Sequence, residues 1–116
     1  MANQKVLLKE GDTLIQEGAT SNNMYWLQSG QLVVVKMRGT HPVELGHIYS
    51  GELVGEMSFL DGKPRSASVR AITECELIEI PREAFEKVFS GQPIWFQGLV
   101  KTLTDRLRKT SAKVRV

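Results

Sequence analysis

One stretch in the middle of the chain combines residue types that together could bind a sugar phosphate. Gly55 allows the backbone to approach a ligand closely. The turn after it can point the backbone N–H groups of Met57 and Ser58 at an anion. Arg65 supplies a planar fork of donors that suits a phosphate, and Ser66 adds a hydroxyl. These residues predict a cradle for a small anionic ligand.

Glu56 has a different role within the same stretch. A carboxylate repels phosphate but accepts hydrogen bonds from hydroxyl groups. We therefore expect a ligand that carries a phosphate and at least one sugar hydroxyl. There is an alternative interpretation. Glu56 could be a surface carboxylate, and Arg65 could be a structural arginine paired with Glu56 or another carboxylate, because a buried guanidinium needs some anion.

The pattern in this stretch is Gly55-Glu56, a short apolar turn, and then Pro64-Arg65 followed by small residues. It resembles the phosphate-binding cassette of the cyclic-nucleotide-binding domain family. The resemblance implies that Glu56 binds the ribose 2′-hydroxyl and that Arg65 and Ser66 bind the cyclic phosphate. It implies cyclic AMP as the ligand, with cyclic GMP as the alternative, because a hydroxyl after the arginine also occurs in members that bind cyclic GMP.

The tail from residue 107 to 114 is similar to the matching helix of the catabolite activator protein group within this family. There a Thr-Ser pair touches the adenine amino group, with one residue from each subunit of a dimer. The resemblance implies that Thr110 and Ser111 read the purine edge. By composition alone, the same two residues would be a frayed helix end.

Composition describes an ordinary globular chain. Its 116 residues predict one domain, residues 1–116, and 41% hydrophobic with 24% charged residues is typical of a soluble fold. The net charge of +2 gives no argument for nucleic acid. No secretory leader or membrane-spanning run is visible, so we expect a cytoplasmic protein. Within these residues we also expect no DNA-binding domain of the helix-turn-helix type.

The first part of the chain alternates short β-rich runs with glycine-marked turns, and the last part is helical. This order predicts an α+β fold, an antiparallel β jelly roll with C-terminal helices and a short helix in the cassette. A proline should open a helix over 81–89, which Gly91 ends, and Pro93 should start a second one. Strands are expected over 6–8, 13–16, 24–28, 31–37, 43–49, 67–71 and 76–80, with a turn over 38–42.

The second C-terminal helix carries Leu99, Leu103 and Leu107 at a spacing of four, so they form one stripe. The stripe needs a surface to cover, either the domain's own sandwich or the same stripe of a second copy. The basic residues in its tail, which include Arg106 and Arg108, favour a solvated face or an acidic partner. We expect a monomer or weak homodimer, with movement of this helix relaying the signal to an unknown protein effector.

Other reactive residue types give no catalytic or metal site. His41, on a turn, and His47, on a strand, lack the third ligand of a cupin-like metal centre. Ser58 has no plausible partner base, and Cys75 is expected to be a small core residue. The sequence therefore predicts a non-catalytic sensor. The alternatives are an interaction domain that has lost its ligand and an enzyme on a jelly-roll scaffold.

Overall fold

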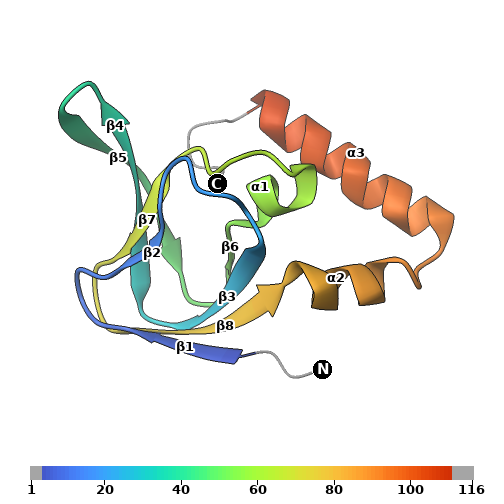
Figure 1. The fold of residues 1–116 in the computed structure, drawn as a ribbon, viewed down its shortest axis with the longest axis horizontal. Coiled ribbons are helices and arrows are strands. Elements are labelled where there is room, and N and C mark those ends of the chain that lie inside the picture. The colour runs from blue at the N-terminus through green and yellow to red at the C-terminus, as the bar shows by residue number, and fades with distance from the viewer. Residues whose placement is uncertain (1–3, 111–116) are drawn as a thin grey trace.

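The structure, a computed structural model, describes residues 4–110 and consists of two antiparallel sheets followed by helices. Figure 1 shows the sheets wrapped into a roll, with the helices at one end. The first sheet has the order β1 (Gln4–Leu8), β8 (Cys75–Pro81), β3 (Asn23–Ser29), β6 (Leu53–Val54). The second has the order β2 (Thr13–Ile15), β7 (Ser68–Ala71), β4 (Gln31–Arg38), β5 (His41–Tyr49). The predicted α+β jelly roll is confirmed.

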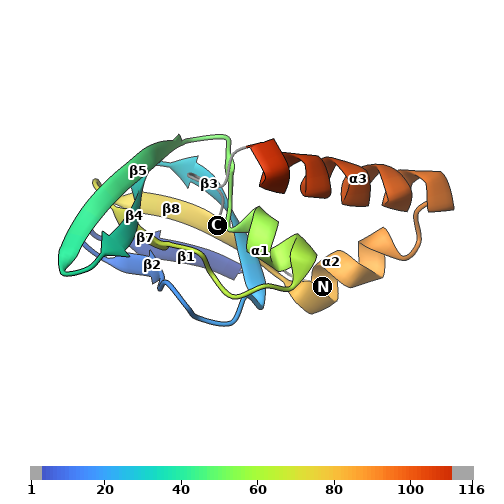
Figure 2. The same cartoon turned by 90° about the horizontal axis from the view of Figure 1, so that it is seen from above.

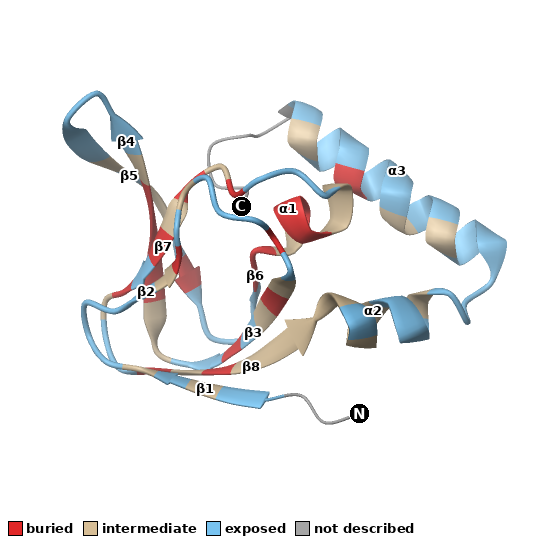
Figure 3. Cartoon of the chain, viewed as in Figure 1, coloured by how far each residue is buried: buried red, intermediate tan, exposed pale blue. Residues whose placement is uncertain are grey.

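The core lies between the two sheets. Strand side chains alternate between the two faces of a sheet, so one set from each strand points into the roll. Leu27 and Leu77 of the first sheet and Leu32 and Val69 of the second are each fully buried there. Cys75 on β8 is 4% exposed and belongs to the same cluster, as predicted. Figure 3 shows buried positions along the strands of the roll and on α1.

Three helices complete the fold: α1 (Glu56–Asp61), α2 (Arg82–Phe89) and α3 (Ile94–Thr110). Pro81 precedes α2 in an extended conformation, and Pro93 directly precedes α3, so both predicted proline starts are confirmed. Figure 2 shows α2 and α3 projecting from one end of the roll, with α1 between the roll and α3. The cassette helix therefore lies where it can contact both.

Most predicted strands differ from the structure by only one or two residues at an end, and two differences matter more. Strand β6 was not expected: its Leu53 and Val54 pair with Trp26 and Tyr25 of β3. The turn predicted over 38–42 is also too long, because β5 already begins at His41 and Pro42 pairs with Met37. Proline is tolerated there because β5 is an edge strand, where its missing N–H costs no ladder bond.

The leucine stripe of α3 does not cover the chain's own sandwich. Leu99, Leu103 and Leu107 are 46%, 49% and 40% exposed. Trp95 at the start of the helix is also exposed, whereas Thr104 is buried. Within residues 4–110, the sandwich therefore does not bury the leucine stripe, and the other surface considered, the stripe of a second copy, stays a prediction. No helix within residues 4–110 is long and apolar enough to cross a membrane.

Candidate functional site

The cassette begins where the chain leaves β6 and enters α1. Gly55 stands at this junction with a φ of 77°, in the left-handed region, and it is buried. Nη1 of Arg65 donates a hydrogen bond to the carbonyl oxygen of Gly55 at 2.6 Å. A Cβ on residue 55 would lie 2.5 Å from the same nitrogen. Glycine is thus required both by the backbone and by the close approach of the arginine.

Arg65 is buried, with 5% of its surface exposed. Its second terminal nitrogen, Nη2, donates to the carbonyl oxygen of Asn23. Burial lowers the pKa of the guanidinium below its usual value, and the electrostatic effects of Tyr25 and Glu56 partly oppose this. Both of these hydrogen bonds go to neutral backbone carbonyl groups.

The other predicted cassette residues are close to this arginine in the chain or in space. Glu56 is the first residue of α1 and is half-buried, while Met57 and Ser58 are 2% and 0% exposed. Ser66 follows Arg65 and is also half-buried. Its carbonyl oxygen accepts a hydrogen bond from Nζ of Lys36 at 2.7 Å. Hydrogen bonds from Ser58 to Pro64 and from Arg65 to Gly55 thus hold the two halves of the cassette together.

The predicted adenine-reading pair is not placed by the structure. Thr110 is the last residue of α3, and nothing is described of its side chain. Ser111 lies outside the described residues. Their predicted contact with a purine stays a prediction.

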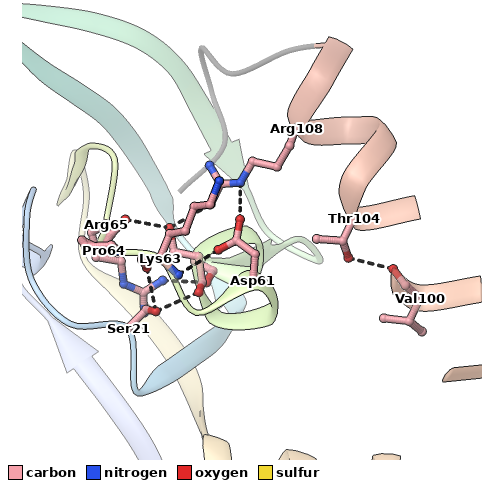
Figure 4. Close-up of polar contacts among 10 residues, drawn as sticks. Ser21, Asp61, Lys63, Pro64, Arg65, Val100, Thr104 and Arg108 are labelled. Carbon is pink, nitrogen blue, oxygen red and sulfur yellow. Dashed lines mark hydrogen bonds and ion pairs between the residues drawn. The ribbon is translucent and has the colours of Figure 1, made fainter. Parts of the chain in front are cut away.

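A residue that the sequence reasoning missed does reach the cassette from α3. Nε of Arg108 lies 2.5 Å from Oδ2 of Asp61, and Nη2 of Arg108 donates to Oγ of Ser58 at 3.1 Å. Figure 4 shows the arginine reaching across to α1. The side chains of Arg108 and Asp61 are only 20% and 14% exposed. The expectation that this part of the tail is a solvated face is therefore wrong for Arg108.

A second arginine fastens α2 to α1. Cζ of Arg82 lies 4.4 Å from the centroid of the Phe59 ring, a cation–π geometry. Its Nη2 donates to the carbonyl oxygens of Ser21 at 2.8 Å and Phe59 at 2.7 Å. The ring of Phe85 of α2 packs edge-on against the ring of Phe59, with 5.2 Å between the ring centroids. The helix after the roll is thus tied to the cassette by both polar and aromatic contacts.

Two hollows adjoin the cassette. One of about 160 Å³ lies between the β2–β3 loop and β3, and Arg65 lines it. The other, of about 400 Å³, lies between α1, α2 and α3, where Phe59, Phe85 and Thr104 line it. Arg65, the side chain suited to bind phosphate, lines the smaller hollow and not the larger one. Within the described residues, no group of three or more His, Cys, Asp or Glu side chains could hold a metal ion.

A sequence model described as the cyclic nucleotide-binding domain matches residues 5–92, from β1 to just past α2. The chain belongs to the cyclic nucleotide-binding domain family. The matched residues include the whole cassette. The match also extends over all eight described strands of the roll, so the cassette and the jelly roll belong to one domain.

Relatives of this cyclic nucleotide-binding domain include transcriptional regulators and ion channels. The cAMP-activated global transcriptional regulator CRP of Salmonella typhimurium is 33% identical over 104 residues, which cover 88% of this chain and 50% of CRP. A cyclic nucleotide-gated potassium channel of Rhizobium etli is 31% identical over 100 residues, 86% of this chain and 27% of the channel. The chain thus spans about half the length of the CRP relatives.

Solved structures agree with this family assignment. The Thermus thermophilus catabolite activator protein has a TM-score of 0.77 and 30% identity, covering 92% of this chain and 51% of that one. The cGMP-bound form of the EAL enzyme Bd1971 has a TM-score of 0.82 and 26% identity, covering 91% of this chain and 28% of that one. Its cAMP-bound form has a TM-score of 0.79, 26% identity and the same two coverages.

Proposed function

We propose that residues 1–116 form a cytoplasmic, non-catalytic sensor domain that binds 3′,5′-cyclic AMP and releases it unchanged. Membership of the cyclic nucleotide-binding domain family supports the ligand class. The choice of cyclic AMP is supported by the similarity to the regulator named as cAMP-activated and to a neighbour solved with cAMP bound.

In this proposal each cassette residue has one task. Arg65 and Ser66 bind the cyclic phosphate, and Glu56 accepts a hydrogen bond from the ribose 2′-hydroxyl. Gly55 has no side chain and so lets the Arg65 guanidinium, together with the phosphate it binds, lie close to the backbone. The N–H groups of Met57 and Ser58 face the phosphate and ribose.

The burial of Arg65 is the observation that carries the proposal. The side chain is 5% exposed, and its hydrogen-bond partners within residues 4–110 are the carbonyl oxygens of Gly55 and Asn23. Carbonyl dipoles offset only part of the cost of burying a positive charge, and the pKa of the guanidinium is accordingly lowered. A phosphate anion at this position would add a charge-assisted contact to the buried guanidinium and offset more of that cost.

Cyclic GMP is the second candidate ligand. Ser66 supports it, because a hydroxyl directly after the arginine can donate to a ligand group as well as to phosphate. A structural neighbour solved with cGMP bound is as similar to this chain as the cAMP-bound form of the same protein.

The proposed output is a movement of α3. Thr104 is buried and Arg108 contacts α1, so the described position of α3 is a docked one. If Thr110 and Ser111 contact the purine only in the docked position, nucleotide shifts the population toward it by the difference in affinity and no more.

Isothermal titration of the whole chain with cyclic AMP and, separately, with cyclic GMP tests the proposal. We expect both to be bound through the cassette, with cyclic AMP bound more tightly. Tighter binding of cyclic GMP would reverse the choice of ligand. No heat and no thermal shift with either nucleotide would favour an interaction domain that does not use the cassette.

A further inference from the structure

We propose that Arg108 is a positioning residue that clasps the C-terminal part of α3 to the cassette helix, and that nucleotide affinity depends on this clasp. The first half of the proposal concerns the nucleotide-free chain. The second half rests on the proposed function.

The clasp has two points of attachment on α1. Nε of Arg108 meets Oδ2 of Asp61 at 2.5 Å, and Nη2 donates to Oγ of Ser58 at 3.1 Å. Residues three apart in a helix lie on the same face, so one planar guanidinium can reach both. Arg108 therefore fixes the last turn of α1 in position and in rotation.

The contacts continue from Ser58 to the segment that carries Arg65. Oγ of Ser58 donates to the carbonyl oxygen of Pro64 at 3.3 Å. Oγ of Ser21 donates both to the carbonyl oxygen of Ser58 at 2.8 Å and to that of Lys63 at 3.1 Å. The Ser58 side chain thus connects Arg108 directly to Pro64, the residue before Arg65.

Burial distinguishes this ion pair from an ordinary surface pair. The Arg108 and Asp61 side chains are 20% and 14% exposed, whereas those of Lys5 and Glu76, a surface pair at 3.1 Å, are 59% and 40% exposed. Exposed pairs contribute little because water screens them. Removing one partner of a mostly buried pair leaves a charge without compensation, which is far more costly.

Apolar packing holds this part of α3 only weakly. Leu99, Leu103 and Leu107 are each at least 40% exposed, and a hollow of about 400 Å³ lies between α1, α2 and α3. The polar clasp therefore carries a larger share of the docking of α3 than it would in a well-packed helix pair.

The first test is hydrogen exchange in the absence of nucleotide. In Arg108→Gln we expect the amides of 100–107 to exchange at least about tenfold faster than in the wild type, because the docked state is lost more often. Lys109→Gln is the matched control, since it removes the same charge from an exposed side chain in the same turn. Equal exchange in both variants would overturn the clasp.

The second test asks whether the two partners act as one unit. Asp61→Asn should accelerate the same amides, and the double variant should exchange no faster than either single one. The swapped pair, Asp61→Arg with Arg108→Asp, should regain part of the protection. Additive effects without rescue would show that Arg108 supports α3 in some other way.

The third test is titration of the same variants with cyclic AMP. We expect Arg108→Gln and Asp61→Asn each to weaken binding by roughly fivefold, with no further loss in the double variant and no change in Lys109→Gln. Faster exchange with unchanged affinity would refute the dependence of affinity on the clasp. A wild type that binds neither nucleotide, with the exchange results as expected, would refute the proposed function while the clasp stands.

Discussion

The carbonyl oxygen of Gly55 accepts a hydrogen bond from Nη1 of Arg65 at 2.6 Å, so the residue that opens α1 and the arginine behind it form one unit. The glycine provides the space that the arginine occupies. Neither can be changed without affecting the other.

Gly55→Ala should destabilise the fold by about 2 to 4 kcal/mol, from left-handed backbone strain and from contact with the guanidinium. Gly62→Ala is the matched control, because its φ of 75° is similar but a Cβ there meets nothing within 4 Å. We expect it to cost only about 1 kcal/mol. Urea unfolding of both variants measures the difference, and equal losses would show that the contact contributes nothing.

Arg65→Ala should weaken cyclic AMP binding by roughly 30-fold to 1000-fold, because charge-assisted bonds to a desolvated phosphate are lost. Arg65→Lys should recover part of this, since a point charge cannot make a bidentate contact. Arg70→Ala, at an exposed position on β7, should leave affinity unchanged. Titration that finds wild-type affinity in Arg65→Ala would rule out the cradle.

The role of Glu56 can be tested with a ligand that lacks one oxygen. The wild type should prefer cyclic AMP over its 2′-deoxy analogue by about 1 to 3 kcal/mol, because the carboxylate loses a hydrogen-bond donor. Glu56→Ala should lose most of that preference. Titration of both proteins with both ligands measures it, and the same discrimination in each protein would place the ribose elsewhere.

Glu17 should make stability depend on pH. Its pKa is lowered, first by the hydrogen bond from the Met37 N–H and then by Lys36, whose Nζ lies 3.2 Å from its carboxylate. The stabilisation is therefore fully present above the unfolded pKa of about 4.3 and is lost as the pH falls through the lower folded value. Unfolding curves from pH 6 down to pH 3 should show this loss in the wild type and a smaller one in Glu17→Gln.

The leucine stripe of α3 should support weak self-association. Exposed apolar area contributes about 25 cal/mol per Å² when a partner covers it, so a modest patch on a second copy provides a few kcal/mol. We expect a monomer–dimer equilibrium in sedimentation that Leu103→Glu abolishes. Thr102→Glu adds the same charge beside the stripe and should leave the dimer intact. A wild type that stays monomeric at high concentration would contradict this.

Much of this fold could be predicted because its signals are local. The β-branched run over 31–37, the alternation over 43–49, the proline starts and the Gly55–Arg65 pattern each depend on residues close in the chain. Strand β6 was missed because two residues between glycines carry no period. Its assignment depends on pairing with Tyr25 and Trp26, which is a tertiary event.

The contact of Arg108 could not be predicted for a related reason. Its partner Asp61 is 47 residues away, and a basic residue near a helix end is most often solvated. The sequence also could not predict whether Leu103 is exposed, because periodicity shows that a stripe exists but not which surface covers it. Local chemistry therefore predicted the cassette, and only the three-dimensional arrangement showed how α3 meets it.

The position of Cys75 gives the chain a built-in reporter. It is the only cysteine in the sequence, it is 4% exposed, and β8 is an interior strand of its sheet, between β1 and β3. A thiol reagent can reach it only when the structure around the start of β8 opens. The labelling rate of the unmodified protein therefore measures how often the roll opens, and a nucleotide that binds only the closed roll would slow it in proportion to its occupancy.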